Sequence, residues 1–293
     1  MKKFFEGKAI LLALCTTIVT LGMLKLIGLI TTPIEGRFDV YVESAIGEAL
    51  LAVFALGTVF YFGQRDVYKF DAKGFFRGLL CGGYFIFAGI YTLSYYGYLA
   101  TNWDNLSSEV KESIEMLNID FSGYVIQTPL HIIAFVITML LIGIAEESLF
   151  RGLVAEFLIR QYGNSKKGII KAVVISGLFF GALHLNNGFE TGFEAAAVQA
   201  IVTSLMGMVL AVVFFKSHTL WAPIAVHAFI DFAGLAIQGG ILGSPNGDTS
   251  FVSAMDYTVA NLSGAIPYII VLIIVLREKN LEIIAENYRE YEK

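Results

Sequence analysis

The sequence contains little charge, little proline and almost no cysteine. Asp, Glu, Lys and Arg make up only 15% of the 293 residues, whereas soluble proteins carry about 25%. The hydrophobic fraction is 56% and the mean hydropathy is +0.70. This composition excludes a disordered chain and a collagen-like fibre. A net charge of -5 without a basic face also excludes a nucleic-acid-binding protein.

The two cysteines, Cys15 and Cys81, both fall inside apolar stretches. Neither a disulfide framework nor a cysteine-based zinc ribbon can therefore be built. The first apolar run, Ala9 to Thr31, is long enough to span a hydrocarbon core of ~30 Å. We expect it to be a retained membrane helix and not a cleaved signal peptide.

Eight apolar segments of this kind occur along the chain. They cover residues 9–31, 45–62, 75–99, 130–150, 169–185, 195–215, 220–238 and 262–276. Backbone polar groups inside a bilayer must be bonded within the segment, and these runs lack the alternation of membrane β-barrel strands. We predict an all-α, polytopic membrane protein with about eight transmembrane helices, in which residues 1–293 form a single transmembrane domain.

The basic residues predict the orientation of these helices, because Lys and Arg concentrate in cytoplasmic loops. With a cytoplasmic N-terminus, 17 of the 20 Lys and Arg residues fall on the cytoplasmic side. We expect both termini in the cytoplasm and the protein in the cell membrane, specifically the cytoplasmic membrane of a bacterium. Residues 277–293 are predicted to form a cytoplasmic amphipathic tail. Its apolar stripe consists of Leu281, Ile284, Tyr288 and Tyr291.

Two adjacent carboxylates, Glu146 and Glu147, lie inside the fourth apolar segment. A charged side chain at the bilayer centre costs at least ~2.5–3.5 kcal/mol on insertion scales, so the pair requires an explanation. Arg151 follows Glu147 by four residues on one helix face and can neutralise it. Glu146 points about 100° away and suits a general base. The alternative is a purely structural cluster in which both acids share Arg151.

Two further apolar segments each carry a histidine. His184 lies in the fifth segment, and His227 precedes Asp231 by one helical turn in the seventh. At ~1.5 Å per residue, Glu146 and His184 come out ~20 Å from the cytoplasmic edge and His227 ~11 Å. Either histidine alone is more typical of a satisfied core residue. Three helices that each carry a titratable group nevertheless predict a shared site in the membrane.

These residues form three short motifs, each weak alone but specific in combination. With them the sequence resembles the CPBP family, the CAAX proteases and bacteriocin-processing (Abi-domain) proteins, which includes the type II CAAX prenyl endopeptidases. The motifs occur in the family's order: EExxxR at Glu146-Glu147-x-x-x-Arg151, FxxxH at Phe180-x-x-x-His184 and HxxxN/D at His227-x-x-x-Asp231. The resemblance covers residues 130–238, which we expect to be a CPBP-like catalytic core.

The resemblance implies an intramembrane endopeptidase. Glu146 and His184 would activate a water molecule, while His227 and residue 231 would stabilise the oxyanion. Prenyl-processing members often carry Asn at the last motif position, whereas this chain has Asp231. An ionised Asp cannot donate a hydrogen bond, so we expect Asp231 to orient His227 or to help hold a metal. The remaining motif residues would support the structure: Glu147, Arg151 and Phe180.

The resemblance leaves the cofactor open. The family is commonly described as metalloproteases, yet the chain has no HExxH motif of zinc proteases. Two imidazoles and a carboxylate, from Glu146, His184 and His227, could hold Zn²⁺ with an open water position. The same groups could also act without a metal. The spacing does not decide between these two mechanisms.

We therefore predict an intramembrane endopeptidase whose substrate is a peptide or a membrane-associated protein, such as the precursor of a secreted peptide. Its other partner is the lipid bilayer, and no nucleic acid is expected. One alternative is a noncatalytic bacteriocin-immunity or binding protein that retains the fold. Another is a proton-coupled transporter that uses the Glu and His groups as relays. No pair of Gly/Pro-interrupted half-helices recurs in two halves of the chain, which disfavours the transporter.

Overall fold

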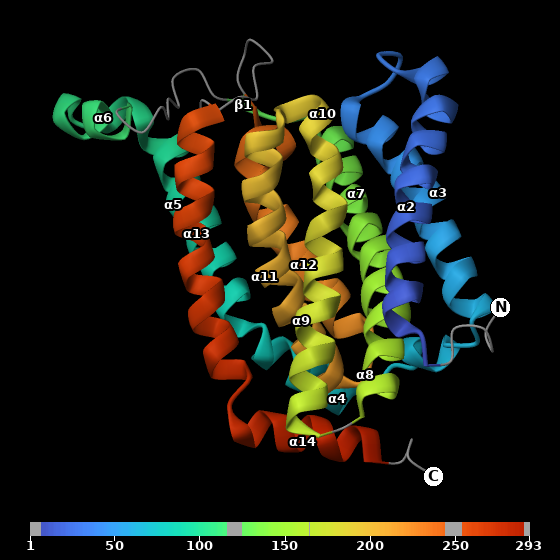
Figure 1. Cartoon of the computed structure of the whole chain (residues 1–293). Coiled ribbons are helices and arrows are strands. Elements are labelled where there is room, and N and C mark those ends of the chain that lie inside the picture. Colours follow the sequence, from blue (N-terminus) through green and yellow to red (C-terminus); the bar gives the residue numbers. More distant parts are fainter. Residues whose placement is uncertain (1–6, 116–124, 164, 244–253, 290–293) are drawn as a thin grey trace.

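The computed structural model describes residues 7–115, 125–163, 165–243 and 254–289. Nearly all of these residues are helical, and the long helices run side by side in one bundle (Figure 1). The strands in these ranges are β1 (Val125–Ile126) and β2 (Leu242–Gly243), which pair antiparallel with Val125 opposite Gly243. The predicted all-α class is confirmed.

The helices follow one another along the chain with short connections. The α-helices are α2 (Ala9–Thr31), α3 (Val40–Tyr61), α4 (Ala72–Cys81), α5 (Gly83–Asn102), α6 (Ser108–Glu115), α7 (Pro129–Glu147), α8 (Glu156–Tyr162), α9 (Lys166–Leu183), α10 (Gly188–Thr191), α11 (Phe193–Ser217), α12 (Trp221–Leu235), α13 (Ala254–Val275) and α14 (Glu278–Tyr288). The 3₁₀-helices are η1 (Thr32–Ile34), η2 (Arg65–Tyr68), η3 (Trp103–Asn105) and η5 (His184–Asn187), and the π-helices are η4 (Ser148–Ala155) and η6 (Ala236–Gly240).

Five described helical segments are long and apolar enough to cross a membrane unaided. They are Ala9–Ile34, Val40–Tyr61, Pro129–Tyr162, Lys166–Asn187 and Phe193–Ser217. The pair α4 and α5 forms a sixth candidate, while α12 and the Ala265–Val275 part of α13 are shorter apolar helices. Each predicted apolar segment thus contains an apolar helix. The number of crossings and the side on which the termini lie stay predictions.

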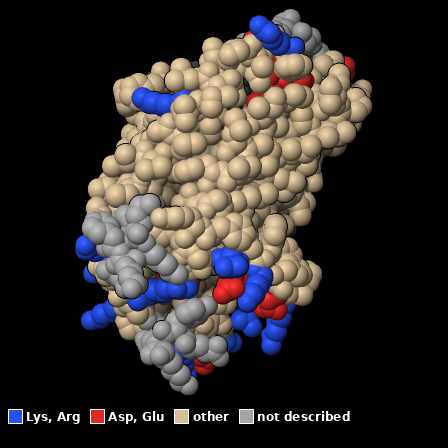
Figure 2. Space-filling view, turned by 90° about the vertical axis from the view of Figure 1, so that its right-hand side faces the viewer, with Lys and Arg blue, Asp and Glu red and all other residues tan. Residues whose placement is uncertain are grey.

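The surface around α2 and α3 is suited to a bilayer. Figure 2 shows charged side chains gathered at its two ends, with a wide and largely uncharged band between them. Large apolar side chains are exposed on these helices, including Leu29 at 74% and Val53 at 69%. Apolar exposure on this scale is unfavourable in water and neutral in lipid. The bundle is therefore a multi-pass membrane protein.

The segment predicted as one helix over residues 75–99 consists instead of two helices, α4 and α5, bent by 65°. Two glycines, one on α4 and one directly after it, lie against the beginning of α12. A Cβ atom on Gly78 would lie 2.5 Å from the Ala222 Cβ, and one on Gly82 would lie 2.8 Å from a Val226 methyl group. These close approaches hold α4 against α12, so the chain turns at Gly82 before α5 begins.

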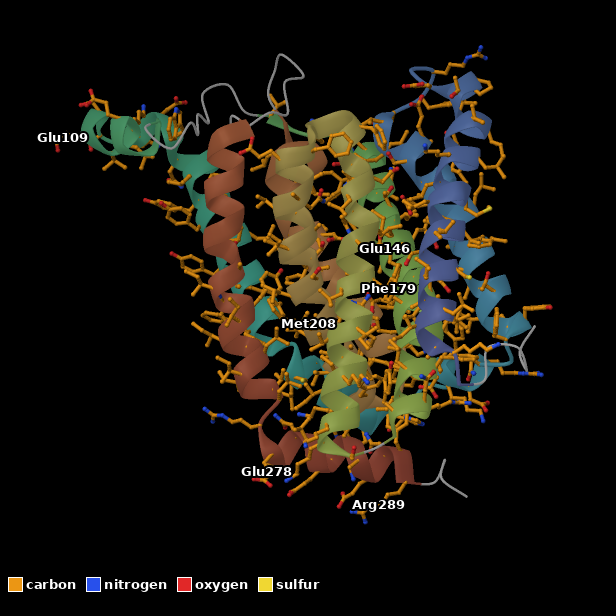
Figure 3. All side chains as sticks on the ribbon, viewed as in Figure 1. Glu109, Glu146, Phe179, Met208, Glu278 and Arg289 are labelled. Carbon is orange, nitrogen blue, oxygen red and sulfur yellow. The ribbon has the colours of Figure 1, made fainter. Side chains whose placement is uncertain are left out.

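The fourth predicted segment, residues 130–150, is the first part of a longer helical run. α7 continues through the π-helix η4 into α8, and the run ends at Tyr162. The wider π turn falls directly after Glu147, and such turns often accompany functional sites. Glu146, which directly precedes this junction, lies about midway along the bundle (Figure 3).

Glycines also allow α9 and α11 to pack closely beside the motif residues. A Cβ atom on Gly177 would lie 2.6 Å from the Ser204 carbonyl oxygen. One on Gly181 would lie 2.3 Å from the Ala200 carbonyl oxygen. Since backbone atoms cannot yield as a flexible side chain does, these positions require glycine.

We expect Gly181→Ala to destabilise the protein by about 1–3 kcal/mol, because the added methyl group overpacks the contact between α9 and α11. The matched control is Gly22→Ala on α2, where a Cβ atom would meet nothing within 4 Å. Thermal melting in detergent compares the two variants. Equal melting temperatures would show that the close helix contact contributes little to stability.

The predicted tail over residues 277–293 forms α14, apart from its last residues, 290–293, which lie outside the described ranges. Its stripe residues Leu281, Ile284 and Tyr288 are buried. The Tyr288 hydroxyl donates to Glu156 Oε2 at 3.1 Å, and Glu278 pairs with Lys166. The apolar stripe therefore packs against the end of the bundle. Its cytoplasmic location stays a prediction.

Candidate active site

The EExxxR motif places a fully buried ion pair at the junction of α7 and η4. Arg151 Nη1 lies 2.9 Å from Glu147 Oε1, and both side chains have 0% exposure. Arg151 Nη2 also donates to the Gly207 carbonyl oxygen at 3.1 Å, and the guanidinium lies over the Phe180 ring at 4.3 Å. The predicted pairing of Glu147 with Arg151 is confirmed. The pair ties α7 to α9 and α11.

His227 on α12 contacts the same carboxylate. Its Nδ1 lies 2.7 Å from Glu147 Oε1, and the ring is 3% exposed. Glu147 Oε1 therefore accepts a hydrogen bond from His227 and forms an ion pair with Arg151. The sequence predicted only the contact of Glu147 with Arg151. The contact with His227 could not be predicted, because 80 residues separate it from Glu147 and helical spacing carries no information about contacts between helices.

The second imidazole nitrogen faces two partly exposed carboxylates. His227 Nε2 lies 3.4 Å from Asp231 Oδ2 and 3.7 Å from Glu146 Oε2. The Asp231 side chain is 23% exposed and that of Glu146 is 18% exposed. The predicted shared face of His227 and Asp231 is present. Glu147 therefore fixes one side of the ring, and the other side faces two partly exposed acids.

His184 lies at the end of α9, where the chain passes into η5. Its Nδ1 is 3.0 Å from the Phe180 carbonyl oxygen, and its ring packs edge-on against the Phe180 ring at 5.0 Å. The His227 ring contacts the same Phe180 ring at 5.8 Å. Both histidine rings thus contact the Phe180 ring. Among the described residues, no hydrogen bond or ion pair joins His184 to Glu146.

A zinc site built from Glu146, His184 and His227 does not form in this arrangement. Within residues 7–115, 125–163, 165–243 and 254–289, no group of three or more His, Cys, Asp or Glu side chains could hold a metal ion. The residues present therefore do not fit the implied ligand set. The acids and imidazoles of the protein itself are the groups available for catalysis at this position.

Glu48 is a further acid near the cluster that the motifs do not include. It lies on α3 and interacts electrostatically with Glu146 and Asp231. In the sequence it is an ionisable group near the outer end of the second apolar segment, residues 45–62. A structural pair or snorkelling is the usual explanation for such a residue, and no motif connects the second segment to the fourth.

The comparisons with known proteins match the same region. A family model described as "Type II CAAX prenyl endopeptidase Rce1-like" matches residues 128–233, from the start of α7 nearly to the end of α12. The matched range contains all three motifs, whereas Glu48 lies outside it. The comparison with curated proteins gave no match.

Proposed function

We propose that the chain is an intramembrane protease of the CPBP family, as the match of residues 128–233 to the CAAX prenyl endopeptidase model supports. In this proposal Glu146 and His227 hydrolyse a peptide bond in a membrane-associated substrate. The observation that carries the proposal is the arrangement around His227. One ring nitrogen is fixed by Glu147 at 2.7 Å, and the other faces Glu146 and Asp231. Glu146 as general base and His227 Nε2–H as hydrogen-bond donor are thereby close together, and Glu146 is partly exposed.

The proposed reaction begins with a water molecule next to Glu146. Glu146 takes one proton from this water, and the water oxygen forms a bond to the carbonyl carbon of the peptide. His227 Nε2–H donates to the oxygen that becomes negatively charged. The carbon–nitrogen bond then breaks, and the proton on Glu146 passes to the leaving nitrogen. The products are one carboxylic acid and one amine.

The other motif residues support these two groups. Carboxylates next to both ring nitrogens suit His227 to carry a proton on each of them. We assign Glu147 and Arg151 to positioning, because Glu147 holds the imidazole and Arg151 holds Glu147. His184, which packs against the Phe180 ring, would act with Glu146 on the same water.

Asp231→Asn is expected to retain activity within about ten-fold of wild type, because Asn keeps a carbonyl oxygen and adds an N–H donor at the position where family members often have Asn. Asp231→Leu removes both groups and should lower kcat by about 10²-fold. Cleavage rates of the two variants, normalised to folded protein, test this role. A much weaker Asn variant would show that the negative charge of Asp231 is required.

The test of the proposed function is cleavage by the purified protein in lipid nanodiscs. The substrates are a farnesylated peptide ending in a CAAX sequence, the same peptide without the prenyl group, and an unrelated membrane-anchored peptide. Mass spectrometry in ¹⁸O-labelled water should show one ¹⁸O atom in the new carboxyl group. Glu146→Gln is the control. If Glu146→Gln cleaves as fast as wild type, Glu146 is not the general base. If wild type cleaves none of these substrates, a noncatalytic protein replaces the proposal.

A further inference from the structure

Glu48 lies within α3 at a position where an ionisable group is costly. Such residues usually pair with another charged group or bond to the backbone. The structure shows neither for Glu48, which makes no hydrogen bond or ion pair with any residue in the described ranges. Lys25, the basic residue within α2, lies over the Phe189 ring. A structural partner therefore does not explain Glu48.

A cavity of about 290 Å³ lies between α2 and α3, and Glu48 forms part of its wall. Carboxylates and hydroxyls line much of it: Thr31, Glu35, Glu43, Ser44 and Glu48. Glu35 is exposed on the loop between the two helices, so the cavity meets water at that end. Figure 2 shows acidic side chains gathered at the upper end of this face. A polar cavity of this size has room for several water molecules.

Glu48 lies at about the depth of Glu146 in the bundle. Thr138 on α7 donates to the Tyr41 carbonyl oxygen on α3 at 3.1 Å, and Glu48 and Glu146 follow these two residues by seven and eight positions on helices that run in the same direction (Figure 1).

The Glu48 carboxylate interacts electrostatically with Glu146 and Asp231, the two acids that face His227 Nε2. From Glu43 to Glu48, α3 descends about 7.5 Å into the bundle at ~1.5 Å per residue. One side chain thus lines the cavity and lies within electrostatic range of two acids of the candidate site.

Hydrolysis consumes one water molecule per peptide bond, and lipid around the bundle does not supply it. We infer that the cavity between α2 and α3 is the route by which water reaches Glu146, and that Glu48 is the positioning residue that holds this water where the route crosses α3. This inference rests on the proposed hydrolysis. It adds a residue outside the matched range of residues 128–233.

Cysteine labelling tests the route without any need for catalysis. Single cysteines replace Ser44, Glu48 or Ile46 in a background that carries Cys15→Ser and Cys81→Ser. Ile46 is the matched control, because it lies on the same helix between the two test positions but is 40% exposed and does not line the cavity. The probe is a charged, membrane-impermeant methanethiosulfonate, applied to the protein in nanodiscs.

We expect Ser44→Cys and Glu48→Cys to react at least ten-fold faster than Ile46→Cys, because a thiolate attacks the reagent and a thiol ionises only where water reaches it. The same reagent should lower kcat at least ten-fold in the Ser44→Cys protein by filling the cavity. It should leave kcat of the Ile46→Cys protein within two-fold. Labelling of Glu48→Cys as slow as that of Ile46→Cys, or unchanged kcat after Ser44→Cys is labelled, would overturn the inference.

Substitutions of Glu48 separate its role from a purely structural one. Glu48→Leu should lower kcat at least ten-fold with KM unchanged, and Glu48→Asp should restore most of the rate. Unchanged kcat in Glu48→Leu contradicts the inference. If wild type cleaves no substrate while Glu48→Cys still labels rapidly, the proposed hydrolysis fails and the hydrated cavity remains. If wild type cleaves a substrate but Glu48→Cys labels slowly, the proposed hydrolysis stands and the water route fails.

Discussion

Glu146→Gln should lower kcat by about 10²–10⁴-fold and leave the melting temperature near that of wild type. Gln keeps the size of the side chain and removes the proton acceptor. The structure indicates a small cost in stability, because the Glu146 carboxylate lies 3.7 Å from His227 Nε2 and is 18% exposed. A group with such a loose contact contributes more to chemistry than to folding.

The matched control for this variant is Glu147→Gln, one residue further along the helix. Glu147 is fully buried and bonds both Arg151 and His227. Its replacement should therefore lower the melting temperature as well as the activity, since Arg151 loses its counter-charge. The measurement is cleavage rate per folded molecule, with a melting curve for each protein. A wild-type rate in Glu146→Gln would remove Glu146 from the reaction.

The parts of the site that lie within one helix could be predicted from the sequence. Helical spacing places Arg151 beside Glu147 and Asp231 beside His227, and the structure shows both pairs. Apolar run length likewise predicted helical structure in each of the eight segments, although residues 75–99 form two helices where one was predicted. These features depend on local geometry, which is the same for every α-helix.

Contacts between helices could not be predicted in this way. The bond between Glu147 and His227 depends on how α7 and α12 pack, and spacing carries no information about that packing. The bend at Gly82 depends on the close approach of α4 to Val226 on α12. Hydrophobic periodicity also does not distinguish the π-helix η4 from an ordinary helical turn.

Glu48 shows a further limit of sequence reasoning. An ionisable group in an apolar segment is costly, but from the sequence alone a structural partner is a sufficient explanation for it. The structure places it in the wall of a polar cavity and within electrostatic range of two acids of the candidate site. An isolated ionisable residue in a span is thus informative only when its neighbours are known.

The second large effect is expected for Arg151→Met, which should destabilise the protein by about 3–5 kcal/mol. Met fills a similar volume but leaves Glu147 buried at 0% exposure with His227 as its charged contact. The guanidinium also bonds the Gly207 carbonyl and covers the Phe180 ring, so α9 and α11 lose a shared contact. We expect a lower yield and an earlier melting transition in detergent.

A double-mutant cycle separates the charge effect from the packing effect. Glu147→Gln combined with Arg151→Met removes both buried charges, so the double variant should be more stable than Arg151→Met alone. Its activity should stay low, because a Gln at position 147 holds the His227 imidazole without a negative charge. Strictly additive losses of stability, together with full activity in folded Arg151→Met, would contradict the positioning role that we assign to this pair.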